Sequence, residues 1–248
     1  MKLSDITIGC DPEFAGFIAN RRLNFRDILS SNGTFGWDHG GQVAELRPPA
    51  AKHARTIVRR LRSIMQDAPI AARVAKWRAG AFVSNPATAL GGHIHLGLSP
   101  SIHQESLKSL SKFTETLFAL DILPDEENKC RQNGSDYGSL DDYRIAYFKD
   151  AFVFEYRAMC SWLFDPNVTM LALTGAKLAA FDPDFTLETF KPAKHSHKQL
   201  REFFEAFKSK NSDAQYVVEK ILPKIKEANP DVDIQDAWEL EKPKQASA

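Results

Sequence analysis

The chain has 248 residues, of which 43% are hydrophobic and 26% are charged, proportions typical of a soluble globular protein. Its 32 Lys and Arg residues balance 32 Asp and Glu residues, so the overall charge gives no argument for binding to nucleic acid or to a membrane. The length fits one sizeable domain, or one domain with an appendage.

The cysteines and the apolar stretches indicate the cellular compartment of the protein. Cys10, Cys130 and Cys160 are an odd number without metal-ligand spacing. A disulfide framework is therefore not expected, and we predict a reducing cytoplasm. Residues 1–11 do not have the pattern of a signal peptide. The most apolar stretch, 168–181, is too short to span a bilayer and contains Lys177.

The N-terminal part predicts strands. Residues 3–14 form the first, which ends in Asp-Pro-Glu-Phe, and Pro12 places this end at a sheet edge or bulge because proline lacks an amide donor. Residues 17–20 are predicted to form a short return strand. A turn-rich segment, 30–41, leads into a further strand at 42–47.

Residues 51–79 predict helix, divided in two at Pro69. Ile57, Leu61 and Ile64 give an apolar stripe, and the opposite face is strongly basic. The simpler interpretation of the basic segment 52–78 is a solvated helix face. The alternative is a docking surface for an anionic partner such as nucleic acid, a polyglutamate-like chain or a cell-wall polymer.

Two short strands follow, at 81–84 and 91–98, and the second reads Gly-Gly-His-Ile-His-Leu-Gly-Leu. Alternate side chains of a strand point to opposite faces, so His93 and His95 share one face and the apolar residues take the other. That face could be the wall of a site. An ordinary half-buried strand with two surface histidines fits this stretch equally well.

The remaining elements are a helix at 101–120, a loop at 131–144, a strand at 152–157, and helices at 167–180, 194–209 and 214–228. The loop carries Arg131 and Arg144, whose guanidinium groups could close over a phosphate or lie exposed on the surface. His195 and His197 lie two apart where a helix begins, so they do not face each other and are not predicted to form a site. Residues 230–248 are polar, and Trp238 could hold part of them against the protein.

Polar pairs at a spacing of two recur on four predicted strands: Asp11 and Glu13, Glu45 and Arg47, His93 and His95, Glu155 and Arg157. Charged residues are almost never buried without partners. Acids, imidazoles and arginines on one sheet face therefore predict cations beside an anionic, phosphorylated substrate. Oxygen ligands suit Mg²⁺ or Mn²⁺, and imidazole can join for Mn²⁺. The sequence has no P-loop, no G-x-G-x-x-G and no G-x-S-x-G motif.

Five motifs in a fixed order resemble a known family. They are Gly-x-Asp-Pro-Glu-Phe (9–14), Glu-Leu-Arg-Pro (45–48), Gly-Gly-His-Ile-His-Leu-Gly (91–97), Tyr-Gly…Tyr-Arg (137–144) and Glu-Tyr-Arg (155–157). In this order they resemble the carboxylate–amine ligases, or amidoligases, of the glutamine synthetase and glutamate–cysteine ligase superfamily. The phage-encoded type-2 group is the most similar. The resemblance spans roughly residues 6–160.

The resemblance implies an α+β fold, with a curved, mostly antiparallel sheet of the glutamine synthetase catalytic type and helices on its convex side. It implies an ATP- and metal-binding catalytic domain at 1–181, and we expect a helical C-terminal extension with a loose polar tail at 182–248. The implied metal ligands are Asp11, Glu13, Glu45, His93 and Glu155. The implied ATP-binding residues are Arg47, His95, Tyr137, Arg144 and Arg157, and the implied catalytic residues are His95, Arg131, Arg144 and Arg157.

The implied reaction is an ATP-dependent, ADP-forming ligation with Mg²⁺ or Mn²⁺. A carboxylate attacks the γ-phosphate of ATP to give an acyl phosphate, and an amine then displaces phosphate. The expected substrates are small molecules or peptides, and nucleic acid is not favoured as a partner. Two alternatives stay open: a metal-dependent hydrolase that uses His93 and His95, and a non-enzymatic binder of an anionic polymer through residues 52–78.

Overall fold

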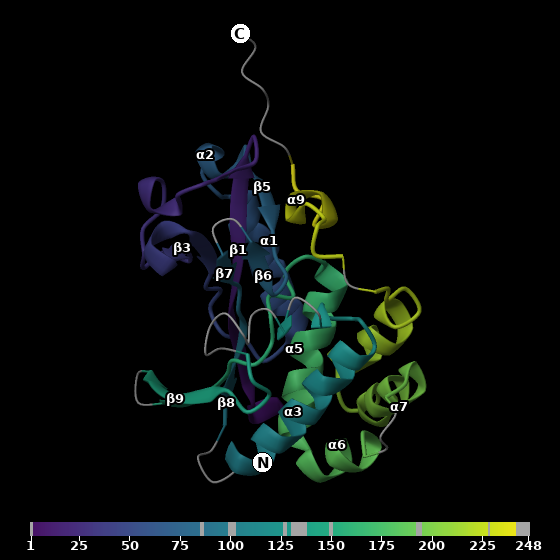
Figure 1. Cartoon of the computed structure of the whole chain (residues 1–248). Coiled ribbons are helices and arrows are strands. Elements are labelled where there is room, and N and C mark those ends of the chain that lie inside the picture. The colour runs from purple at the N-terminus through teal and green to yellow at the C-terminus, as the bar shows by residue number, and fades with distance from the viewer. Residues whose placement is uncertain are drawn as a thin grey trace.

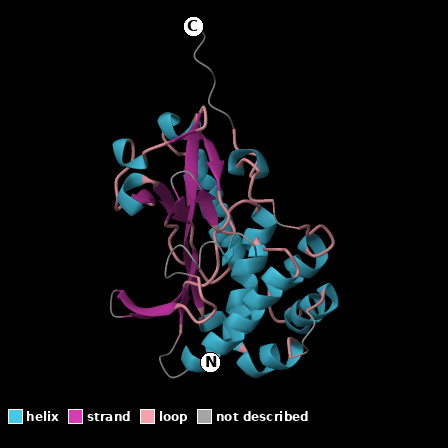
Figure 2. Cartoon of the chain, viewed as in Figure 1, coloured by secondary structure: helices cyan, strands magenta, loops and turns pink. Residues whose placement is uncertain are grey.

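A computed structural model describes residues 2–84, 87–98, 103–125, 128–129, 138–148, 151–191, 195–227 and 229–241. A sheet forms one layer, and the long helices form a second layer against one of its faces (Figure 1). The mixed helix and antiparallel-sheet architecture that the sequence predicts is therefore confirmed (Figure 2).

Eight strands form the main sheet, and every pairing between them is antiparallel. The order along the sheet is β3-β4-β1-β8-β10-β9, and β2 and β5 also pair with β1. The strands are β1 (Thr7–Ile18), β2 (Arg21–Arg22), β3 (Phe35–Asp38), β4 (Val43–Leu46), β5 (Lys76–Arg78), β8 (Gly92–Gly97), β9 (Tyr143–Phe148) and β10 (Ala151–Tyr156). A separate two-stranded sheet pairs β6 (Phe82–Ser84) with β7 (Ala87–Ala89).

The helical layer is built around two long helices, α3 and α5. The helices are α1 (Ala54–Gln66), α2 (Ile70–Arg73), α3 (His103–Ala119), α5 (Pro166–Phe181), α6 (Pro183–Thr189), α7 (His197–Phe207), α8 (Ser212–Tyr216) and α9 (Ile234–Ala237). Three 3-10 helices, η1 (Leu3–Asp5), η2 (Phe25–Asp27) and η3 (His39–Gly41), and one π-helix, η5 (Val217–Ile221), complete the described elements. None of these helices is both long and apolar enough to cross a membrane.

The side chains of strand β1 alternate between the two faces of the sheet. Ile8, Cys10 and Phe14 are buried in the core that the sheet shares with the helices. Asp11 and Glu13 lie between them in sequence and therefore point to the other face. This alternation leaves one face apolar for packing and the other face free for polar chemistry.

Helix α5 forms the centre of the helical layer, and its residues from Val168 to Ala180 are buried all round. Gly175 lets it approach α3 closely, because a Cβ at this position would overlap the ring of Phe113. Residues after Asp182 pack on the same core through Phe203 and Phe207. Trp238 is buried, and its indole N–H donates to the carbonyl of Leu163 at 2.7 Å, which holds the segment around α9 in place as predicted.

Three secondary-structure predictions are wrong. Strand β1 continues to Ile18, and the return strand is β2, because the turn lies at Ala19 and Asn20, which both have positive φ. The basic segment 52–78 does divide at Pro69 into two helices, α1 and the single turn α2, but its last residues form strand β5 and not helix. Trp77 is fully buried in β5 and packs 4.8 Å from the ring of Phe14, so tertiary packing overrides the helical pattern.

The predicted turn segment 30–41 contains strand β3, and the predicted loop at 131–144 ends in the first residues of β9. Residues 131–137 of that loop lie outside the described part of the chain. The predictions for Arg131 and Tyr137 fall there as well.

Candidate active site

The strand register brings the predicted polar residues to one face. Glu13 of β1 lies directly opposite Glu45 of β4, and Asp11 lies opposite His93 of β8. Glu155 of β10 is the register partner of both His95 and Arg144. Side chains of directly opposite residues point to the same side of an antiparallel sheet. Residues separated by up to 144 positions in the chain, from 11 to 155, therefore meet on the face away from the helices.

The carboxylates of this face are buried. Glu13 is 4% exposed, Glu45 is 6% exposed and Glu155 is 2% exposed. Asp11 is 9% exposed. Burying four carboxylates within one face costs free energy unless cations or hydrogen bonds compensate them. The partners of each carboxylate therefore define what the face can bind.

Asp11 lies between the two imidazoles. Its carboxylate oxygens are 3.2 Å from Nδ1 of His93 and 3.3 Å from Nε2 of His95. Burial raises the pKa of Asp11, but the two histidines outweigh burial and bring its pKa well below the usual value. Burial lowers the pKa of His95, but the bond to Asp11 outweighs that effect and leaves the pKa raised. Asp11 is thus a stable anion at neutral pH.

Glu155 lies at the centre of a cationic group. It binds the guanidinium of Arg144, and its Oε1 lies 3.4 Å from Nε of Arg157 and 3.8 Å from Nδ1 of His93. Arg144 is 60% exposed at its side chain, so its guanidinium can reach a ligand on the open side of the face. Arg157 is largely buried and also lies 3.9 Å from Asp142. Arg144 is therefore the exposed cation of this pair and Arg157 the largely buried one.

Glu13 and Glu45 are two like charges in direct opposition. Burial raises the pKa of Glu13, and it raises the pKa of Glu45 to about 9, aided by the negative charge of Asp11 and opposed by Arg47. Arg47 binds Glu45 and also donates to the carbonyls of residues 31 and 33 at 2.9 and 3.2 Å. Glu13 accepts a hydrogen bond from the backbone N–H of Gly91, at 2.6 Å. This pair would be ionised together only beside an added cation.

The space around His93 explains why position 91 is a glycine. A Cβ there would lie 2.5 Å from Nε2 of His93, so a larger residue would displace the imidazole ring. Gly91 therefore both donates to Glu13 and leaves room for His93. These two effects explain why a glycine precedes the histidines in the Gly-Gly-His-Ile-His motif.

The donor set fits a divalent cation. Among the described residues, two groups offer ligand atoms within 4.8 Å of one another: Asp11, His95 and Glu155, and Glu13, Asp38 and His39. Asp11 Oδ1 and Glu155 Oε1 are buried and lie beside the nitrogens of His93 and Arg157, at 3.2 and 3.4 Å. Carboxylate oxygens with one imidazole suit Mg²⁺ or Mn²⁺.

The sequence analysis missed Asp38, His39 and Asp142. Nε2 of His39 lies 4.0 Å from Glu13, and both residues line a small cavity of about 60 Å³ with His93 and Arg157. The adjacent acid and imidazole of Asp38-His39 were a usable signal, but the segment was interpreted as a turn and not as the end of strand β3. His195, by contrast, bonds to Thr116 at 2.9 Å and to Glu115 at 3.3 Å on helix α3, and it is no part of this face.

Buried carboxylates, imidazoles and arginines thus meet on one face of the sheet. The chain belongs to the family described as Phage phiEco32-like COOH.NH2 ligase-type 2, which matches residues 8–240. The resemblance that the five motifs predicted is confirmed.

Solved structures give remote matches. A bifunctional glutathione synthetase from Pasteurella multocida has a TM-score of 0.48 and 10% identity, with 94% of this chain and 48% of that chain covered. A glutamine synthase homolog has a TM-score of 0.46 and 10% identity over 95% of this chain and 71% of its own. The ligase PafA in complex with the prokaryotic ubiquitin-like protein Pup has a TM-score of 0.47 and 10% identity, over 96% and 64%.

The chain thus spans about half the length of the glutathione synthetase, and scores below 0.5 carry no argument about function. No curated protein matches the sequence.

Proposed function

We propose that the protein is an ATP-dependent ligase that joins a carboxylate to an amine through an acyl phosphate and releases ADP and phosphate. The observation that supports this most strongly is the convergence of Asp11, Glu13, Glu45 and Glu155 with arginines on one sheet face. A reaction between two anions needs their repulsion cancelled before they can meet. This face offers both kinds of group that can do so.

The metal ions of the proposal would be held by Asp11, Glu13, Glu45, His93 and Glu155. Further candidates are His95, whose ligand atom lies within 4.8 Å of those of Asp11 and Glu155, and Asp38 and His39 beside Glu13. When bound, Mg²⁺ or Mn²⁺ would neutralise phosphate charge and polarise the phosphoryl group. The residues fit this role because burial raises the pKa values of Glu13 and Glu45, and a bound cation would allow both carboxyl groups to ionise.

The arginines would handle the phosphate groups. Arg144 is exposed enough to exchange Glu155 for a phosphate oxygen, whereas Arg157 is held between Glu155 and Asp142. Guanidinium forks bind phosphate in a bidentate manner. We therefore propose Arg144 for the transferred phosphoryl group, Arg157 for its positioning, and Arg47 and His95 for the nucleotide phosphates. Arg131 stays a prediction for the transferred phosphoryl group, and Tyr137 stays a prediction for ATP binding.

The proposed reaction balances in two steps. In the first, an oxygen of the substrate carboxylate bonds to the γ-phosphorus while the bond to the β,γ-bridging oxygen breaks, and ADP leaves with that oxygen. In the second, the amine nitrogen bonds to the acyl carbon and phosphate leaves. The proton that the amine loses passes to a carboxylate or to water at the face.

Three further proposals accompany this function. Residues 1–181 carry the catalysis, and residues 182–248 support that domain through the core they share with α3 and α5. The substrates are a small-molecule or peptide carboxylate and an amine. The enzyme works in the cytoplasm, since its described cysteines, Cys10 and Cys160, are free and buried.

The function is tested by calorimetric titration of the protein with a non-hydrolysable ATP analogue in the presence and absence of Mn²⁺. Metal-dependent binding is expected for the wild type and is expected to be lost in Glu155→Gln. Glu202→Gln is the matched control, because Glu202 is exposed on α7 and lies outside the site. Absence of metal-dependent binding in the wild type would refute the proposal.

A second assay measures ADP release with a panel of carboxylates and amines. ADP release that requires both substrates is expected. Cleavage of amides or phosphoesters without ATP would instead establish the metal-dependent hydrolase alternative. If neither ADP release nor cleavage is detected, the titration with the ATP analogue decides.

A further inference from the structure

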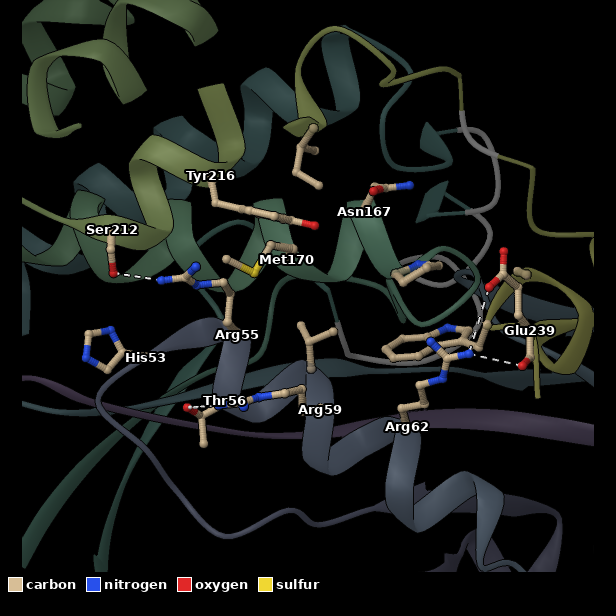
Figure 3. Close-up of a pocket in the computed structure, with 15 residues that line it drawn as sticks. His53, Arg55, Thr56, Arg59, Arg62, Asn167, Met170, Ser212, Tyr216 and Glu239 are labelled. Carbon is tan, nitrogen blue, oxygen red and sulfur yellow. Dashed lines mark hydrogen bonds and ion pairs between the residues drawn. The ribbon is translucent and has the colours of Figure 1, made fainter. Parts of the chain in front are cut away.

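A large groove lies on the helical side of the molecule, away from the candidate active site. It has a volume of about 920 Å³, and it runs between α1, the start of α5, α8 and the residues after α9 (Figure 3). Helix α1 packs its apolar side towards the core with Ile57, Leu61 and Met65. The groove and the active-site face are therefore on opposite sides of the sheet.

Three arginines of α1 line this groove. Arg55, Arg59 and Arg62 follow one another at i, i+4 and i+7, which places them on one side of the helix over about 10 Å. Arg55 is neutralised by the buried Asp213 at 2.8 Å, and Arg62 lies 3.9 Å from Glu239. The guanidinium of Arg59 bonds to Thr56 at 3.4 Å, and no described acidic side chain pairs with it.

A second hollow of about 400 Å³ continues the basic character. Its described lining residues include no acid. They include four lysines: Lys52, Lys177, Lys208 and Lys210. The two hollows share His53 and Ser212, so they adjoin each other. We call the side chains of Lys52, Arg55, Arg59, Arg62 and Lys210, with the two hollows that they line, the basic track.

Helix α1 keeps this charge at a cost. It has 13 residues with four arginines and no acidic residue. Like charges at i, i+4 destabilise a helix, and positive charge in the first turn opposes the helix dipole. A solvated helix face would ordinarily relieve both effects with interspersed acids. Since the whole chain has as many acidic as basic residues, the track is a local accumulation of positive charge.

We propose that the basic track binds a ligand with several phosphate groups in a row, as in an oligonucleotide or an inorganic polyphosphate. Arginine forks match phosphate oxygens, and lysines bind them as point charges. The groove also presents neutral donors, the hydroxyl groups of Thr56 and Tyr216 and the amide of Asn167 (Figure 3). A phosphate group has enough oxygens to accept from such donors and from an arginine together, whereas a carboxylate has two.

The test uses a fluorescently labelled oligothymidylate of about twelve nucleotides and measures anisotropy across a series of salt concentrations. The buffer contains EDTA and no ATP, so the proposed metal site is not loaded. Arg59→Glu and Lys52→Glu are each expected to weaken binding by about tenfold and to lower the slope of log K against log salt by about one. The matched control, Lys198→Glu on α7, is expected to change binding by less than about twofold.

The outcomes separate the ligand sources. Competition by inorganic tripolyphosphate supports the proposal with a small polyphosphate as the source, and competition by an unlabelled oligonucleotide alone supports it with nucleic acid. The proposal is overturned if the oligonucleotide does not bind at about 50 mM salt. It is overturned as well if polyglutamate competes while neither tripolyphosphate nor the unlabelled oligonucleotide does. It is also overturned if Arg59→Glu, shown to be folded by circular dichroism, binds like the wild type.

The proposal is independent of the proposed ligase function. Glu155→Gln is expected to keep oligonucleotide binding while it loses the ATP-analogue binding described above. Loss of both in this variant would place the oligonucleotide in the active site and overturn the assignment to the basic track.

Discussion

The substitution Glu45→Gln separates a metal-binding face from a purely structural ion-pair network. Glu45 and Glu13 lie opposite each other on β4 and β1, and both are buried. Without a cation, Glu45 holds a proton in the folded protein, because its pKa is raised from 4.5 to about 9. Glutamine keeps the size of the side chain and removes the charge. The variant should therefore lose cation binding without losing stability.

The magnitude follows from proton linkage. Between the unfolded pKa of 4.5 and the folded value of about 9, the folded state binds one proton more than the unfolded state. Wild-type stability therefore falls as pH rises through this window, by up to about 1.4 kcal/mol per pH unit. From about pH 6 to about pH 8 this loss reaches about 3 kcal/mol, and the Gln variant does not undergo it. In chelator near pH 8, Glu45→Gln is thus expected to be the more stable protein.

Mn²⁺ is expected to remove most of this difference, because it stabilises the wild type more than the variant. At a concentration of about 100 times its dissociation constant, a ligand of the native state contributes about 2.7 kcal/mol, which raises Tm by about 5–11 °C in a chain of this size. If the variant binds Mn²⁺ about a hundredfold more weakly, it gains only about 0.4 kcal/mol at the same concentration. Urea unfolding near pH 6 and pH 8, in EDTA and in Mn²⁺, gives all four values.

One result would refute this reasoning. A structural ion-pair network predicts that Glu45→Gln destabilises the protein at both pH values, because Arg47 loses its partner, and that Mn²⁺ stabilises neither protein. Glu202→Gln, an exposed change on α7, serves as the control for a general effect of removing a negative charge.

Three other changes test the geometry. Asp213→Ala is expected to cost about 3 kcal/mol in urea unfolding, and Asp213→Asn less, because the carboxylate accepts from the Ala54 N–H at 2.8 Å and caps α1 from a distance. Gly175→Ala is expected to lower the free energy of unfolding by about 1–3 kcal/mol, although alanine favours helices, because its Cβ would overlap the ring of Phe113; an unchanged free energy of unfolding would show that the ring moves freely. Arg144→Ala is expected to leave the circular dichroism spectrum unchanged and to reduce ADP release by about a hundredfold or more, since its side chain is 60% exposed and its proposed role is with phosphate; full activity would remove it from the mechanism.

The sequence predicted three strands of the site closely. Glu45, His93 and Glu155 lie in strands that run within a residue or two of the predicted bounds. Period-two alternation of polar and apolar residues is a local property, so it can be recognised without knowledge of the fold. The family motifs added the order in which the strands contribute, and the family match confirms that resemblance.

Where local patterns competed with packing, prediction failed. Lys76–Arg78 continue a basic, helix-like segment, yet they form strand β5 because Trp77 fills a space beside Phe14. Asp38 and His39 were hidden in a glycine-rich segment, and only the pairing of β3 with β4 brings them beside Glu13. Nothing local in the sequence specifies that pairing.

Which residues have alternating polarity, and hence which strands have one polar face, was determined by the sequence itself. Only the tertiary structure decided that Glu13 opposes Glu45 and that Glu155 lies between His95 and Arg144, because strand register depends on contacts between segments far apart in the chain. The same is true of the basic track, since α1 and α8 meet through the buried Asp213 and not through any local pattern. Charge can be counted along a sequence, but its proximity in space is fixed by packing.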